Sequence, residues 1–202
     1  MISKIDKALI SDAIRRAERL TSGEIFCVVM KSVGGYRLVP IAWAAALALL
    51  APGPMIYLTD WTSPLVYLIQ LLLFLSASAV LSHPSLRFRI VPRRMKHDRA
   101  HAEAMRQFFA QGLDKTRNRT GVLIFAAEAE RYAEIVADAG IHEKVTPAVW
   151  DEAIADLVTA IKDDRPADGF LAAVERCGSA LAVHFPPGAL NRNELPDKLL
   201  EL

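Results

Sequence analysis

The residues best suited to binding chemistry are cations that stand directly before an apolar run. The stretch GLDKTRNRTGVLIF, from Gly112 to Phe125, places three cations within five residues. Cations on a loop bind anions such as phosphate, and near a bilayer anionic headgroups attract them. A solvated connection into a buried strand is the alternative, and solvation with membrane attraction is favoured over a dedicated anion site. The expected anion or membrane-surface contacts are Lys115, Arg117, Arg119, Arg93 and Arg94.

A second set of candidates is acidic and lies near the ends of expected strands. Hard cations prefer several oxygen ligands, which carboxylates gathered at a turn can provide. The alternative is an ordinary solvated acidic surface, since no loop has the dense alternating oxygens of an EF-hand. The expected ligands of a divalent cation, Ca or Mg, are Glu24, Glu134, Asp138 and Glu143.

Other reactive residue types give weaker signals. His97 and His101 have the i, i+4 spacing of a helical zinc site, but no third ligand follows, so a peripheral helix face is expected. Cys27 and Cys177 stand in apolar stretches and are expected to be reduced, buried thiols. The chain has no Cys-x5-Arg, aspartyl-phosphatase or P-loop signature, so no catalytic residue is predicted.

Two long uncharged runs dominate the first half of the chain. Leu38 to Leu58 and Pro64 to Ser82 each approach the roughly 20 residues that a helix needs to cross a bilayer. Two buried core helices are the alternative, but they would require a larger core than the remaining chain can build. The proline-rich sequence at residues 52–54 is expected to kink or end the first crossing. The sequence therefore predicts a transmembrane helical hairpin.

Charge predicts the orientation of this hairpin. The connection at residues 59–63 carries only Asp60, whereas Lys31 and Arg37 precede the first run and a basic segment follows the second. The positive-inside rule then places both termini in the cytoplasm. The expected location of the hairpin is the bacterial inner (plasma) membrane.

The basic segment next to the hairpin is the most uneven feature of the charge distribution. Residues 87–119 hold ten Lys or Arg against three Asp or Glu, whereas residues 120–202 hold seven against fifteen. Attraction to an anionic leaflet explains this block, and it lacks the interleaved aromatic residues of a nucleic-acid surface. The lipid bilayer, and membrane protein complexes within it, are the expected partners, and nucleic acid is not expected.

The segments outside the hairpin alternate between helical and strand patterns. An amphipathic helix with Ser3 as its N-cap precedes an apolar strand at Glu24–Met30. A helix burying Ala100, Ala104, Met105, Phe108 and Phe109 leads to Gly112. Strands at 121–127 and 131–141 then form an antiparallel hairpin, followed by a helix from Pro147, a last helix burying Phe170, Val174, Cys177 and Leu181, and an extended tail.

These elements define an α/β fold with a small sheet of three to four strands covered by helices. The strand at Glu24–Met30 is apolar throughout and needs neighbours on both sides, so the segments flanking the hairpin must reunite. The expected domains are 1–36 and 87–190 for the two parts of one α/β domain, 37–86 for the hairpin and 191–202 for the tail.

Several of these stretches resemble a known family. TSGEIFCVV, GLDKTRNRTGVLIFAAEAERYAEIVADAGIHEKV and NELPD are similar to the TPM-domain family, in the bacterial branch with an inserted transmembrane pair. The resemblance implies a helix-covered sheet, and members include photosystem-repair proteins and a receptor auxiliary subunit. Calcium binding is reported for some members and acid phosphatase activity for one branch. We therefore expect a non-catalytic binding or assembly module at the cytoplasmic face, with a weak metal-dependent phosphatase-like hydrolase as the alternative.

Overall fold

A computed structural model describes residues 2–188 and 193–202 and divides the chain into two compact units. One unit combines the residues up to Val33 with those from His97 onward, and the other comprises Gly34–Lys96. The predicted boundary between the domain and its tail, at residues 190 and 191, lies outside the described residues. The first unit is an α/β domain, and the second is a helical hairpin.

A four-stranded mixed sheet forms the centre of the α/β unit, in the order β3-β2-β1-β4. The strand β1 (Glu24–Met30) pairs in parallel with β2 (Gly121–Ala127) along its whole length. On the outer side of β2 lies β3 (Tyr132–Ala137), which runs antiparallel to it. The other edge is β4 (Leu199–Glu201), which is parallel to β1. The predicted fold class is confirmed, and the last residues contribute a strand.

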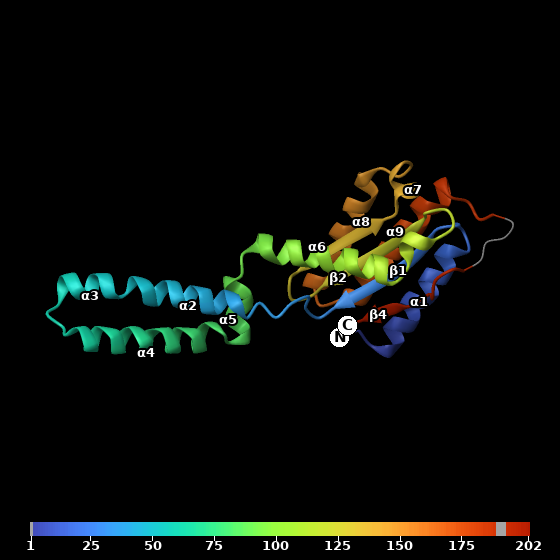
Figure 1. Ribbon diagram of the computed structural model, residues 1–202. Helices are drawn as coiled ribbons and strands as arrows, with labels where there is room; N and C mark the ends of the chain where they lie inside the picture. Colours follow the sequence, from blue (N-terminus) through green and yellow to red (C-terminus); the bar gives the residue numbers. More distant parts are fainter. Residues whose placement is uncertain (1, 189–192) are drawn as a thin grey trace. The chain divides into compact units, whose positions relative to one another are not determined.

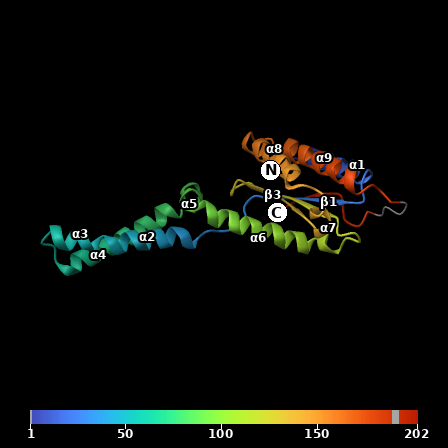
Figure 2. The same ribbon diagram turned by 90° about the horizontal axis from the view of Figure 1, so that it is seen from above.

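Helices cover both faces of this sheet (Figures 1 and 2). One face packs against α1 (Lys4–Glu18), α8 (Pro147–Lys162) and α9 (Pro166–His184), through buried side chains such as Ile14, Leu157 and Phe170. The other face packs against α6 (Arg93–Ala110), which contributes Ala100, Ala104 and Phe108. Because β1 and β2 are buried on both faces, they are apolar at almost every position.

The predicted helix before Gly112 buries a narrower face than the sequence suggests. Ala104 and Phe108 are buried as expected, but Phe109 is 54% exposed and Gln107 is buried in its stead. One residue corresponds to about 100° of rotation around a helix, so Phe109 turns away from the sheet.

The Gly34–Lys96 unit is built around an antiparallel pair of apolar helices (Figure 1). One arm comprises α2 (Leu38–Leu50) and α3 (Pro52–Leu58), and the other is α4 (Ser63–Leu81), followed by the short α5 (Pro84–Ile90). Helical backbone continues through Ala51, whose N–H donates to the Leu47 carbonyl at 3.2 Å. The prolines therefore interrupt the first arm without ending it. Both arms, at 21 and 19 residues, are long and apolar enough to cross a membrane.

Candidate functional site

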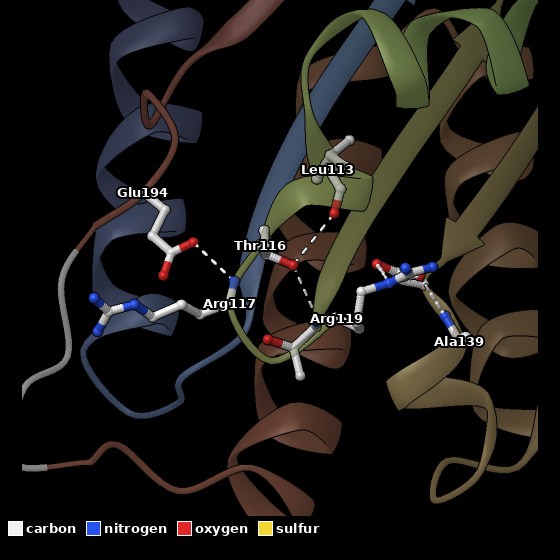
Figure 3. A network of polar contacts seen from close by, with 8 residues as sticks. Leu113, Thr116, Arg117, Arg119, Ala139 and Glu194 are labelled. Atoms are coloured by element: carbon white, nitrogen blue, oxygen red, sulfur yellow. Dashed lines mark hydrogen bonds and ion pairs between the residues drawn. The ribbon is translucent and has the colours of Figure 1, made fainter.

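The basic loop joins α6 to β2 and is held by a network of hydrogen bonds (Figure 3). Gly112 adopts a left-handed conformation with φ of 77° and begins a 3-10 turn, η1, at Leu113–Lys115. The buried hydroxyl of Thr116 then donates to the Leu113 carbonyl at 3.2 Å and accepts from the Thr120 N–H at 3.1 Å. The loop is thus folded onto itself before the chain enters β2.

The cations of this loop point to solvent, as the sequence predicts for a connection. Lys115, Arg117 and Arg119 are exposed, whereas Thr116 and Thr120 between them are buried. The Arg117 backbone N–H donates to a Glu194 carboxylate oxygen at 3.0 Å, which leaves the Arg117 guanidinium outside this contact. The loop therefore exposes the charged ends of its side chains, while hydrogen bonds hold its backbone.

Arg119 differs from its two neighbours because it forms an ion pair. Its Nε lies 2.9 and 3.0 Å from the two carboxylate oxygens of Asp138, which is 4% exposed. This carboxylate also accepts the Ala139 N–H at 2.6 Å and caps the short helix α7 (Ala139–His142). The hydrogen bond and charge of Asp138 raise the pKa of Arg119 above its ordinary value.

Close packing keeps the loop against α7. A Cβ at Gly140 would lie 2.7 Å from the Arg119 carbonyl oxygen and 2.8 Å from that of Asn118. Arg119 itself has a φ of 54°, a backbone conformation that residues other than glycine adopt at an energetic cost. The Arg119–Asp138 pair thus belongs to a tight structural junction at the start of β2.

Buried carboxylates gather at the same end of the sheet, where β1 begins. Glu24 accepts the backbone N–H groups of Glu194 and Leu195 at 3.2 and 3.1 Å, and so holds the C-terminal segment. Glu18 accepts the Ile25 N–H at 2.9 Å. Burial, together with the nearby charges of Glu24 and Asp197, raises the pKa of Glu18 to about 9. Burial also raises the pKa of Glu24.

Sequence reasoning found Glu24 in this cluster but missed Glu18. The signal was present, because Glu18 follows Ile10 and Ile14 at intervals of four residues and therefore shares their buried helix face. Glu194 and Asp197 could not be found in this way, since only the return of the C-terminal segment to the sheet brings them here.

The four predicted cation ligands do not form one cluster. Glu24 pairs in register with Gly121, and the Asp138 N–H donates to the Gly121 carbonyl at 2.9 Å, so these two lie at the same end of the sheet. Glu134 is further along, opposite Phe125, and Glu143 is exposed after α7. Among residues 2–188 and 193–202, no three His, Cys, Asp or Glu side chains are grouped so that they could hold a metal ion.

Glu134 instead belongs to a polar contact between β3 and α6. His101 Nδ1 lies 2.9 Å from one carboxylate oxygen of Glu134, and the Tyr132 hydroxyl donates to the other at 2.9 Å. The His97 ring lies against the Tyr132 ring, with centroids 5.1 Å apart. The two histidines therefore contact β3, as expected for a peripheral helix face that packs on its neighbours.

Two of the expected basic contacts, Arg93 and Arg94, are not part of the basic loop. Arg93 and Arg94 are exposed in the first turn of α6, and the loop follows its last turn. Arg93 and Arg94 belong to the Gly34–Lys96 unit, whereas the basic loop belongs to the α/β unit, so the expected basic contacts are divided between the two units.

This helix-covered mixed sheet, with an apolar hairpin inserted between its two central strands, defines the class of the protein. A family profile described as TPM domain matches residues 79–180, just over half of the 202-residue chain. The chain belongs to the TPM-domain family. The matched residues begin in α4 and end in α9, so α1 and β1 complete the domain from outside the match.

A solved structure shares this fold. The NMR structure of the BA42 protein from the psychrophilic bacterium Bizionia argentinensis matches with a TM-score of 0.62 at 21% sequence identity. The match covers 100% of this chain and 96% of that protein. No curated protein shows a significant sequence match to this chain. At this identity the likeness describes the architecture alone.

Proposed function

We propose that this protein is a membrane-anchored TPM-domain module that binds partners or assists assembly at the cytoplasmic face of the inner membrane. The observation that carries the proposal is the outward-facing apolar surface of the helix pair. Only 17% and 6% of the two candidate spans are buried, and Leu50 and Leu58 are 72% and 81% exposed. Core helices of soluble proteins bury such side chains, and lipid is the solvent in which exposing them is favourable.

The flanking charges support the orientation. Asp60 is the sole charged residue in the connection between the arms, whereas basic residues precede α2 and follow α4. A cation near an anionic leaflet gains about 1 kcal/mol, and cytoplasmic loops of membrane proteins carry the excess of Lys and Arg. The cationic groups that follow α4 closely are Arg87, Arg89, Arg93, Arg94 and Lys96.

A binding role without catalysis is supported by the side chains that the fold exposes and those it buries. Both cysteines are fully buried, and burial raises the pKa of each thiol, which opposes formation of a nucleophilic thiolate. Arg117 and Lys115 instead offer exposed charge on a loop whose backbone is hydrogen-bonded, which suits contact with an acidic partner. The alternative, a divalent-metal-dependent phosphatase-like hydrolase, stays a prediction.

Membrane fractionation tests the anchoring directly. The full chain is expected to remain in the membrane pellet after alkaline carbonate washing and to be released by detergent. A matched variant with two Leu→Lys changes, at Leu49 and Leu72 in the middle of the arms, is expected to lose this behaviour, because each charge at a helix centre costs about 2.5 to 3.5 kcal/mol. Release of the unaltered chain by carbonate would contradict anchoring.

Co-purification tests the binding role. Affinity purification of the full chain in mild detergent is expected to retain partner proteins from the membrane. Replacing Lys115 and Arg117 by Gln is expected to weaken that retention, whereas Arg16→Gln, on an exposed part of α1, is the control. Retention of the same proteins by both variants would assign the contact to another surface.

A further inference from the structure

A small cavity lies where the turn between β2 and β3 meets the end of α8. Its volume is about 230 Å³. The basic loop precedes Gly121 at one end of β2, whereas this cavity adjoins the turn that follows Ala127 at the other end. Val158 and Ile161, one helical turn apart on α8, supply an apolar wall, and Tyr132 contributes an aromatic side chain. Arg131 and Lys162 complete the lining with two cationic groups.

These two cations are not used by the fold. In the described part of the chain, neither Arg131 nor Lys162 has a side-chain ion pair or hydrogen bond, in contrast to Arg119 with its Asp138 partner. Both side chains are exposed, so the charges are available to a ligand. The Arg131 N–H donates to the Glu128 carbonyl at 3.1 Å, which fixes the turn that presents this side chain.

The backbone at Arg131 adds a second observation. Its φ of 52° lies in the left-handed region, which favours Gly, Asn and Asp over Arg. A turn optimised for stability alone would place one of those residues here. An arginine in this conformation costs backbone energy, and residues with such strained backbones often occur at ligand sites.

We propose that this cavity binds a small organic monoanion, with one carboxylate or phosphodiester group on an apolar body. Arg131 and Lys162 contact the anionic group, and the body lies against Val158, Ile161 and the Tyr132 ring. A water molecule takes about 30 Å³ of liquid volume, so the cavity holds about eight non-hydrogen atoms. This is the size of hexanoate, or of the end of a lipid bearing the same chemistry.

A neighbouring hollow limits the ligand to a single negative charge. Glu128 and Asp164 line a second cavity of about 320 Å³, and Ile161 belongs to the walls of both. Two carboxylates beside the site repel a second anionic group. Polyphosphates and nucleic acids are therefore poor ligands for this site.

Methyl NMR on the full chain in zwitterionic lipid nanodiscs tests this proposal. Titration with hexanoate is expected to shift the methyl signals of Val158 and Ile161 in a saturable way, with Ile10 in the core of the domain as an unshifted reference. Hexanol, which lacks the charge, and acetate, which lacks the body, are expected to bind at least about fivefold more weakly. Equal binding of hexanol and hexanoate would overturn the proposal.

Two variants separate the site from non-specific attraction. Arg131→Asn suits the left-handed backbone and removes the charge, and Lys162→Gln removes the other, so each is expected to weaken hexanoate about fivefold in a folded protein. Arg16→Gln and Lys4→Gln, both on exposed positions of α1, are the controls and are expected to change nothing. Unchanged affinity in both cavity variants would refute the site.

Nanodiscs that contain anionic lipid identify the source of the ligand. If the same methyl signals shift without hexanoate, and the shift is lost in Arg131→Asn, the anion is a lipid group. If the signals shift only when hexanoate is added, the ligand is a soluble anion. A shift with anionic lipid that persists in Arg131→Asn and Lys162→Gln would contradict the proposal.

Discussion

At the scale of single residues, the candidate site combines exposed cations with carboxylates that are already bonded. Asp138 shows this most clearly, because one buried carboxylate binds Arg119 and also caps α7. Glu24 similarly binds two backbone N–H groups of the C-terminal segment. These acids stabilise loops around the sheet, whereas Lys115 and Arg117 are exposed cations of the loop.

Replacing Asp138 by Ala is expected to destabilise the domain. The change removes the cap of α7 and leaves Arg119 without its partner, at a cost of about 1 to 2 kcal/mol for the cap alone. Glu143→Ala, at an exposed position directly after α7, is the control and should cost less than about 0.5 kcal/mol. Thermal unfolding of both variants checks this, and equal melting temperatures would refute the structural role of Asp138.

Glu18 is expected to make stability depend on pH. Its pKa is about 9 in the folded chain against an ordinary value of 4.5, so the folded chain keeps a proton that the unfolded chain loses between these values. Stability therefore falls as pH rises through that window, by up to about 1.4 kcal/mol per pH unit. Below the ordinary pKa both states are protonated, and stability no longer changes with pH through this group.

The neutral isostere tests this pH dependence. Glu18→Gln can still accept the Ile25 N–H, so it is expected to melt at a higher temperature than the unaltered chain at about pH 8, with the difference shrinking towards about pH 5. Glu175→Gln, at an exposed position on α9, provides the control. A difference between Glu18→Gln and the unaltered chain that does not change with pH would show that Glu18 is not the titrating group.

At the scale of elements, the edge strand β4 ties the end of the chain to the middle of the domain. Leu199 pairs in register with Cys27 on β1 and is buried, and the Leu202 N–H donates to the Val29 carbonyl at 3.0 Å. The C-terminal residues thus protect one side of β1 from solvent.

Leu199→Ala is expected to lower the free energy of unfolding by about 2 to 4 kcal/mol, because it leaves a cavity beside β1. Leu202→Ala keeps the same backbone contacts and alters a side chain that is 50% exposed, so its effect should stay below about 0.5 kcal/mol. Denaturant unfolding of both variants distinguishes the two roles. Similar losses in both would indicate that β4 contributes through its backbone alone.

The elements that sequence reasoning predicted well are those with a strong local pattern. β1 and β2 have their predicted limits because a short run of mostly apolar residues, which ends before Lys31 in one case and before Glu128 in the other, leaves little freedom in placing a buried strand. β3 was evident from alternation, with Ala133, Ile135 and Ala137 on one face. Its predicted extent to residue 141 was wrong, because Asp138 caps the helix α7 and the strand ends at Ala137. The three residues of β4 carry no period, and their role depends on a contact with β1 almost the whole chain away.

The candidate site was less predictable for the same reason. Lys115 and Arg117 could be recognised as exposed loop residues from their position between Gly112 and β2. The pairing of Arg119 with Asp138 could not, since it depends on how β2 and β3 meet. The expected cation cluster assumed that strand-end acids converge, whereas Glu24, Glu134 and Asp138 each have a nearer backbone or side-chain partner and Glu143 is exposed after α7.

At the scale of the whole molecule, an apolar hairpin divides the sequence of one domain. The inserted unit, Gly34–Lys96, lies in the sequence between the adjacent parallel strands β1 and β2, and it is far longer than an ordinary connection. Both ends of this insertion must lie on one side of any membrane that it enters, because β1 before the insertion belongs to the same sheet as β2 and β3 after it. The proposed topology satisfies this requirement with two crossings.

Cysteine labelling in bacterial spheroplasts tests the membrane topology, which is the central claim. The native Cys27 and Cys177 are fully buried, so they give little background. Asp60→Cys in the exposed connection is expected to react with a membrane-impermeant maleimide in intact spheroplasts, whereas Arg117→Cys in the exposed loop should react only after lysis. Labelling of both positions, or of Arg117→Cys alone, before lysis would contradict the proposed topology.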